Sequence, residues 1–275
     1  MGQFGLKMMD LPLSVFSAPV RIYLLCICAI FGLVMGSALN CLAFRLARGE
    51  KWSGGRSACP TCGHTLHAPD LVPLFSWLFL RGRCRYCGAP ISARYPISEL
   101  ILGASFVLTA LRFGISVQTL AALILCACLF CLSLVDLEVQ LIPDRFLIIP
   151  AAARLLQLFL QGSWRGLLHG LRPALALGGG MLVLALLMDR LLHKESLGGG
   201  DIKLFAMLGL WFSFPCCLLL LLFACVFGLV FAAVTAKMKR GVPFAFGPAI
   251  SAAAFVVLLA GEPIVAWYLG LFLRG

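Results

Sequence analysis

The sequence predicts an all-α polytopic membrane protein. Hydrophobic residues occupy 62% of its 275 positions, charged residues only 12%, and the mean hydropathy is +1.03. These values lie far outside the range of soluble globular domains. Apolar runs recur along the chain at lengths that suit the ~20 residues needed to cross a bilayer core. The composition and the runs together predict helices that cross a membrane several times.

The apolar runs divide the chain into its expected helices. They cover residues 22–44, 97–111, 115–135, 146–160, 173–192, 203–236 and 244–273. The sixth would reach ~50 Å as one helix, against a bilayer core of ~30 Å, and Pro215 offers a break inside it. Splitting it predicts about eight transmembrane helices. The first run lacks a small-residue cleavage site, so we expect it to be retained as a helix rather than removed as a signal peptide.

The net charge of +11 is best explained by topology. Lys and Arg concentrate in the hydrophilic segment before residue 97 and in the loops that follow the third, fifth and seventh expected helices. Examples are Arg45, Arg81, Arg145 and Arg190. The positive-inside rule places such loops in the cytoplasm. We therefore expect membrane lipid as the surrounding partner and no nucleic-acid partner.

A metal site is predicted in the hydrophilic segment. Its cysteines follow the pattern C-x2-C-x21-C-x2-C, with Cys59, Cys62, Cys84 and Cys87 as the four members. Two CxxC pairs are typical of four thiolates around one tetrahedral zinc ion, and a glycine after each pair favours close backbone approach to the sulfur. The alternative, four spare cytosolic thiols, leaves the two matched units unexplained. We expect a structural zinc ion that lets a small loop fold without a core of its own.

Acidic residues are few, and four of the eleven lie in two segments that suggest chemistry. Asp136, Glu138 and Asp144 lie in VDLEVQLIPD, and Asp201 lies in LGGGDIKL. Two carboxylates brought together can activate water, one as base and the other as acid. Asp136 would lie near the negative end of a helix and Asp201 would be the N-cap of the next, so Asp136 is expected to be the protonated partner.

Spacing alone leaves some of these roles open. Asp144 can serve as a helix cap or as the partner of Asp201. Gly198, Gly199 and Gly200 would let an extended substrate approach the Asp201 carboxylate. Arg154 is the one charge that lies inside an apolar run, where it can snorkel to the interface or pair with an acid.

Five motifs in order resemble those of type IV prepilin peptidases, the bacterial membrane aspartic proteases of the GxGD class. They are GSALNCLAFRLARGE from Gly36, the cysteine pairs with RGRCRYC, ISARYPISEL, VDLEVQLIPD and GGGDIKL. By position, the resemblance implies that Asp136 and Asp201 are the catalytic pair. It also implies cleavage of the basic leader of prepilins and pseudopilins at the cytoplasmic face of the bacterial inner membrane, followed by N-methylation with S-adenosylmethionine as methyl donor.

The resemblance sets the expected domains and the remaining alternatives. Residues 1–46 would form the N-terminal region and first transmembrane helix, 47–96 the cytoplasmic zinc-binding domain, and 97–275 the helical membrane peptidase domain. Asp70 and Glu99 are candidates for contact with the methyl donor or the substrate amine, although surface solvation or a helix-end role is the simpler expectation for each. The alternatives are a peptidase with a purely structural zinc loop and no methyl transfer, and a polytopic cation transporter.

Overall fold

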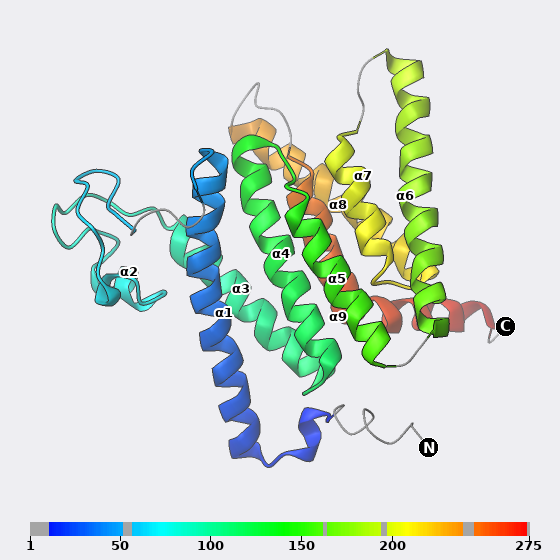
Figure 1. Ribbon diagram of the computed structural model, residues 1–275, viewed down its shortest axis with the longest axis horizontal. Helices are drawn as coiled ribbons and strands as arrows, with labels where there is room; N and C mark the ends of the chain where they lie inside the picture. The colour runs from blue at the N-terminus through cyan, green and yellow to red at the C-terminus, as the bar shows by residue number, and fades with distance from the viewer. Residues whose placement is uncertain (1–10, 52–56, 162–163, 194–196, 239–244, 274–275) are drawn as a thin grey trace. The chain divides into compact units, whose positions relative to one another are not determined.

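The computed structural model describes residues 11–51, 57–161, 164–193, 197–238 and 245–273 (Figure 1). These residues form helices and no strands, as the sequence predicts. The chain divides into two compact units, one ending at Glu138 and the other running from Val139 to the C-terminus. Within the first of these units, the helix after the cysteine segment packs with the first helix.

The described residues of the first unit form four α-helices, two short 3-10 helices and the cysteine segment. After the short 3-10 helix η2 (Leu13–Val15) come α1 (Ala18–Ala47), the 3-10 helix η3 (Ala68–Asp70), α2 (Phe75–Phe79), α3 (Arg94–Phe113) and α4 (Val117–Val139). The cysteine segment, which includes η3 and α2, connects α1 to α3 (Figure 1).

Small residues bring α1 and α3 into close contact. A Cβ added at Gly32 would lie 2.7 Å from the Gly103 Cα atom, and one added at Gly36 would lie 2.9 Å from the Glu99 Cα atom. In lipid, where apolar burial gives little drive for association, such close backbone approach is a main source of helix packing. A buried hydrogen bond between the Asn40 amide and the Ser98 hydroxyl joins the same two helices.

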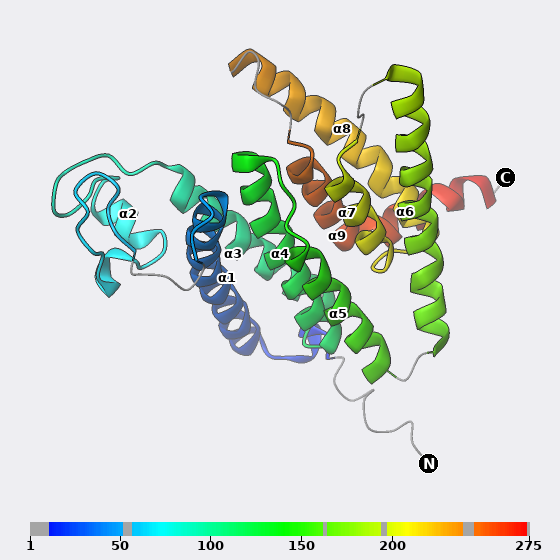
Figure 2. The same ribbon diagram turned by 45° about the horizontal axis from the view of Figure 1, so that its top comes forward.

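Five helices are formed by the described residues of the second unit. They are α5 (Arg145–Leu160), α6 (Trp164–Leu192), α7 (Gly199–Gly209), α8 (Phe214–Met238) and α9 (Gly247–Leu273), with α7 lying along α6 (Figures 1 and 2). Small residues again allow the contact. A Cβ at Gly178 would lie 2.5 Å from the Ala206 Cβ atom, and one at Gly209 would lie 2.4 Å from the Ala174 Cα atom.

Six of the described helices are long and apolar enough to cross a membrane, and these are α1, α3, α4, α6, α8 and α9. The expected count of about eight is not confirmed. Every expected run does form a helix, and the sixth run breaks between Gly209 and Phe214, just before Pro215. However, α5 has 16 residues and α7 has 11, which give lengths of ~24 and ~16 Å, too short for a full crossing.

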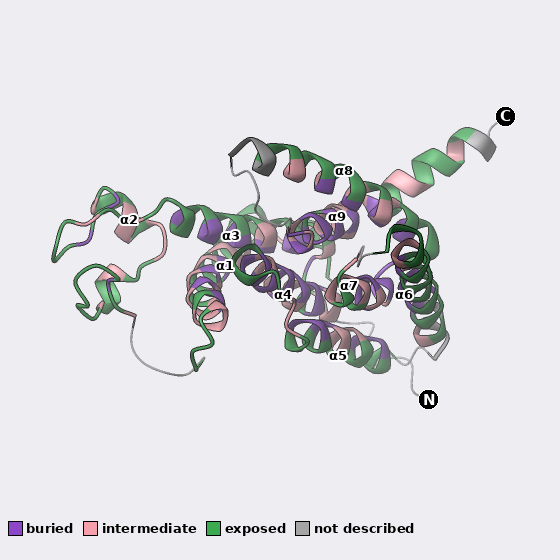
Figure 3. Ribbon diagram, turned by 90° about the horizontal axis from the view of Figure 1, so that it is seen from above, coloured by how far each residue is buried: buried purple, intermediate pink, exposed green. Residues whose placement is uncertain are grey.

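Large apolar side chains are exposed along the helices, which is typical of surfaces that face lipid. Leu175 on α6 is 75% exposed and Leu229 on α8 is 73% exposed. Figure 3 shows exposed and buried stretches alternating along single helices. In a soluble protein such surfaces would be a strong aggregation risk, whereas in a membrane they meet acyl chains.

Candidate active site and metal centre

The four cysteines of the hydrophilic segment lie together. Their sulfur atoms are all within 4.8 Å of one another, and the Sγ atoms of Cys59 and Cys87 are 3.9 Å apart. Four thiolates at ~2.3 Å from a tetrahedral zinc ion are separated by about 3.8 Å. The cluster therefore has the ligand type, the number and the spacing that a zinc ion requires.

Each cysteine pair is shaped by its own backbone turn. The Gly63 N–H donates to the Cys59 carbonyl at 2.8 Å, and the Gly88 N–H donates to the Cys84 carbonyl at 2.9 Å. Both glycines have φ of +71°, and a Cβ at either would meet nothing within 4 Å. These glycines are thus needed because they adopt a left-handed backbone conformation. They do not provide space near the sulfur, as the sequence suggested.

Local hydrogen bonds set the charge of the thiols. Backbone N–H groups of Cys62 and Thr61 lower the pKa of the Cys59 thiol to about 6. At Cys87 the Ala89 N–H lowers the pKa, but desolvation and the neighbouring thiols raise it to about 11. Cys59 is therefore a thiolate at neutral pH, the form that binds metal.

Asp70 organises the segment between the two pairs. Its carboxylate accepts hydrogen bonds from the His67 N–H at 3.1 Å, the Arg85 Nε at 2.7 Å and the Tyr86 hydroxyl at 3.0 Å. Desolvation raises the pKa of Asp70, but these bonds and the charge of Arg85 outweigh it, so the pKa is lowered. The Tyr86 ring also lies 3.7 Å from the His64 ring, which ties the first pair to the second. The Asp70 side chain is 5% exposed, and its bond from the His67 N–H caps η3. Of the two simpler expectations, these contacts support the helix-end role rather than surface solvation.

Glu99 is buried as well, and surface solvation is wrong for it too. It lies in the second turn of α3, is 6% exposed, and accepts a hydrogen bond of 2.7 Å from the Leu74 N–H. Leu74 has φ of +62° and immediately precedes α2. Glu99 thereby fixes the cysteine segment to the membrane helix that follows it.

Asp136 lies near the C-terminal end of α4, as expected. The helix ends three residues later at Val139, and Asp136 is 5% exposed. Buried carboxylates near the negative end of a helix dipole are disfavoured as anions. The exposed Glu138 beside it forms an ion pair with Arg94, the first residue of α3.

Asp201 lies in the first turn of α7, but it is not the N-cap. Gly198 holds that position, and the Asp201 N–H donates to the Gly198 carbonyl at 3.0 Å. The expectation was one turn too late because the glycines are themselves helical from Gly199 onward. A carboxylate at the third helical position still lies at the positive end of the dipole, which favours its ionised form.

Asp144 and the glycines lie around the same helix start. The Asp144 carboxylate accepts a hydrogen bond of 2.8 Å from Lys203 Nζ, and both side chains are 60% exposed. Asp144 is the N-cap of α5 by position but makes no side-chain capping bond. A Cβ at Gly200 would lie 3.0 Å from the Ile142 Cβ atom, and one at Gly198 would lie 3.4 Å from Asp201 Oδ2. The segment 142–144 therefore borders the N-terminus of α7.

The two predicted catalytic residues belong to different units, Asp136 to the first and Asp201 to the second. The chain covers the interval from Asp136 to Ile142 in six residues. Ile142 packs against Gly200, which directly precedes Asp201.

These features define a class: multi-pass helical membrane proteins with a four-cysteine metal loop and carboxylates at helix ends. The bacterial peptidase A24 N-terminal domain model matches residues 30–113, and the type IV leader peptidase family model matches residues 123–233. The chain belongs to the type IV leader peptidase family, the prepilin leader peptidase/N-methyltransferases.

Curated relatives support this membership over nearly the whole chain. The prepilin leader peptidase/N-methyltransferase of Bacillus subtilis (strain 168) is 34% identical over 253 residues, which cover 90% of this chain and 98% of that protein. The protein of the same name from Aeromonas hydrophila is 39% identical, covering 79% of this chain and 76% of its own. That of Neisseria gonorrhoeae is 31% identical, covering 94% and 96%. No solved structure gave a significant match.

Proposed function

We propose that this chain cleaves the basic leader of type IV prepilins and pseudopilins with Asp136 and Asp201 as its catalytic pair. It acts as a multi-pass protein of the bacterial inner membrane with the active site at the cytoplasmic face. Family membership supports leader cleavage. The observation that carries the assignment of residues is that the two aspartates lie at opposite ends of helix dipoles, one buried and one in a first turn.

The opposite environments give the two carboxylates different tasks. Burial near the end of α4 favours a protonated Asp136, which can donate a proton to the leaving amine or polarise the scissile carbonyl. The start of α7 favours an ionised Asp201, which can remove a proton from the attacking water. After the water attacks, the amide C–N bond breaks and the proton from Asp136 goes to the new amine. The proton that Asp201 took from the water then passes to Asp136, which restores the starting protonation of both carboxyl groups.

Two contacts support the pairing of these residues. The segment after Asp136 returns to the start of α7, where Ile142 packs against Gly200. Asp144 forms an ion pair with Lys203 and is 60% exposed, so it lacks the buried environment that Asp136 has. These observations favour Asp136 over Asp144 as the partner.

We also propose that Cys59, Cys62, Cys84 and Cys87 hold a structural zinc ion. Zinc would supply only a cross-link between the two cysteine turns, since four protein thiolates leave no open position for catalysis. Asp70 stabilises this segment through its bond from Arg85, and Glu99 of α3 attaches the segment to that helix through its bond from Leu74.

Methyl transfer to the new N-terminus would use S-adenosylmethionine. The names of the relatives include N-methyltransferase activity, which favours the bifunctional enzyme over a peptidase alone. Asp70 and Glu99 already accept hydrogen bonds from the protein, so the proposal assigns neither to the methyl donor. The transporter alternative would place acids in mid-helix along a path, whereas Asp136 and Asp201 lie at helix ends.

Intact-mass spectrometry of a prepilin incubated with the purified protein tests both activities. Loss of the leader is expected without any addition, and a further gain of one methyl group only with S-adenosylmethionine. Cleavage without the gain would leave a peptidase alone. No cleavage of several prepilins would contradict the proposal and bring the transporter forward.

A further inference from the structure

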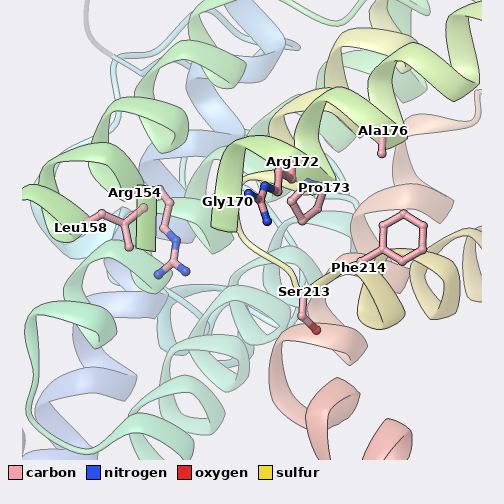
Figure 4. A pocket seen from close by; sticks show the side chains of 8 residues that line it. All are labelled: Arg154, Leu158, Gly170, Arg172, Pro173, Ala176, Ser213 and Phe214. Carbon is pink, nitrogen blue, oxygen red and sulfur yellow. The ribbon is translucent and has the colours of Figure 1, made fainter. Parts of the chain in front are cut away.

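A cavity of about 560 Å³ lies in the second unit, between α5, α6 and the start of α8. Its lining includes two arginines, Arg154 of α5 and Arg172 of α6, together with Ser213 and Phe214. Figure 4 shows the two guanidinium groups extending from their helices toward the side of the cavity where Ser213 lies. The volume falls within the ~300–1,000 Å³ common for ligand sites.

Arg154 is held in place by the protein on one side only. Its Nε donates to the Leu210 carbonyl at 3.3 Å, and another guanidinium nitrogen donates to the Gln157 amide oxygen at 2.9 Å. The guanidinium lies 5.5 Å from the Trp211 ring, and Gln157 is 2% exposed. A guanidinium has five N–H donors, so these contacts orient Arg154 and leave donors for a ligand.

The charges around the cavity leave an excess of positive charge. Within the described part of the chain, neither Arg154 nor Arg172 forms an ion pair. The Glu262 carboxylate borders the lining, where it accepts hydrogen bonds from the Ser213 hydroxyl at 2.8 Å and the Cys216 thiol at 3.4 Å. Because Ser213 already donates to Glu262, the donors left for an anion are the two guanidinium groups. Two guanidinium groups and one carboxylate give a net charge of +1.

The helix surfaces beside the two arginines are apolar and exposed. Leu175 lies one turn after Arg172 on α6 and is 75% exposed, and Phe159 near Arg154 is 73% exposed. Phe214 and Leu218 at the start of α8 are 55% and 56% exposed. In a membrane these side chains meet acyl chains, so a ligand that bridges cavity and surface needs an anionic head with apolar tails.

We propose that the Arg154–Arg172 cavity binds the phosphate group of an anionic phospholipid, whose acyl chains lie on the exposed apolar surfaces of α5, α6 and α8. The two guanidinium groups donate charge-assisted hydrogen bonds to the phosphodiester oxygens, a pairing that arginine forms in bidentate fashion.

The lipid site is separate from the proposed active site. Arg154 contacts Leu210, which directly follows α7, whereas Asp201 lies in the first turn of that helix. The 11 residues of α7 span ~16 Å. Lipid binding at the far end of α7 is thus expected to affect the packing of α5 to α8 without contacting the cleavage site.

Native mass spectrometry of the full-length, delipidated protein in detergent tests the proposal. Phosphatidylglycerol and phosphatidylcholine with identical acyl chains are titrated in turn, and bound lipid is counted. We expect preferential binding of phosphatidylglycerol, weakened about tenfold by Arg172→Gln through loss of a charge-assisted contact and less by Arg172→Lys. Arg172 is exposed, so these variants avoid the folding risk of Arg154→Gln.

Arg190→Gln is the matched control, because Arg190 is an exposed arginine at the other end of the same helix. It should bind phosphatidylglycerol as the unchanged protein does. Equal binding of the two lipids, or equal loss in Arg172→Gln and Arg190→Gln, would overturn the proposal. Displacement of the lipid by an equal concentration of inorganic phosphate would assign the cavity to a soluble anion instead.

Discussion

The Glu99 carboxylate accepts a hydrogen bond of 2.7 Å from the backbone N–H of Leu74, 25 positions earlier in the chain. This bond joins α3, a candidate membrane span, to the N-cap residue of α2 inside the cysteine segment. Leu74 has φ of +62°, a conformation that costs leucine energy and persists only where the surroundings hold it. Glu99 is thus one of the contacts that position the metal loop on the membrane helices.

Replacing Glu99 should loosen this attachment. Glu99→Ala removes a buried acceptor and leaves the Leu74 N–H without its partner, at a cost of roughly 1–3 kcal/mol. Glu99→Gln keeps an oxygen acceptor of the same shape and should cost less. Limited proteolysis of residues 57–92 in the purified protein measures the effect. Equal cleavage rates in the two variants would show that the hydrogen bond does not hold the segment.

The cysteine cluster makes a prediction about metal content. Cys59→Ser and Cys87→Ser each remove one of four ligands, and elemental analysis should show loss of about one zinc ion per chain. Because the site forms only when the loop folds, loss of metal should also expose the loop to protease. Cys225→Ser is the control, since Cys225 lies in α8 outside the cluster. An unchanged zinc content in the first two variants would rule out a zinc site at these cysteines.

The helical architecture was largely predictable, because the apolar composition and the lengths of the apolar runs determine it. Each predicted apolar run forms a helix, and the break before Pro215 was expected from a span of ~50 Å. The number of crossings was harder to predict, because α5 and α7 are apolar but short. Hydropathy reports burial in an apolar medium, whether that medium is lipid or neighbouring helices. Hydropathy therefore could not separate these two helices from full spans.

The site was predicted less evenly. The cysteine cluster follows from spacing, since two matched pairs specify four ligands and the structure brings their sulfur atoms together. For Asp70 and Glu99 the sequence left surface solvation and a helix-end role open; it could not show their burial, because their partners Arg85 and Leu74 lie 15 and 25 positions away. The Arg154–Arg172 cavity depends on two helices packing side by side, and only the position of Arg154 in an apolar run hinted at it.

The catalytic pair predicts the effect of three isosteric changes. Asp136→Asn and Asp201→Asn should each reduce leader cleavage by at least a factor of about 100, because each removes an acid or base from the reaction. The protein should still insert and retain zinc. Asp144→Asn should keep most of the activity, because Asp144 is exposed and paired with Lys203. A gel-based cleavage assay measures all three.

The Asp144 variant serves as the control for the assignment of the catalytic pair. Complete loss of cleavage in Asp144→Asn would make Asp144 the partner of Asp201. Near-normal cleavage in either Asp136→Asn or Asp201→Asn would exclude that residue from the pair.

The glycines before Asp201 differ in what surrounds them, and this allows a test of substrate approach. A Cβ at Gly198 would lie 3.4 Å from Asp201 Oδ2, an ordinary contact, while one at Gly199 would meet nothing within 4 Å. Gly198 has φ of −65°, which alanine adopts easily, so neither change should disturb the fold.

If the substrate backbone passes over the Asp201 carboxylate, Gly198→Ala should slow cleavage at saturating enzyme, whereas Gly199→Ala should not. Gly200→Ala is a poorer probe, since its Cβ would lie 3.0 Å from Ile142 and would combine packing with catalysis. Equal rates for Gly198→Ala and the unchanged protein would mean that the substrate reaches the carboxylate from another side. The thermal stability of each variant distinguishes slower cleavage from a loss of fold.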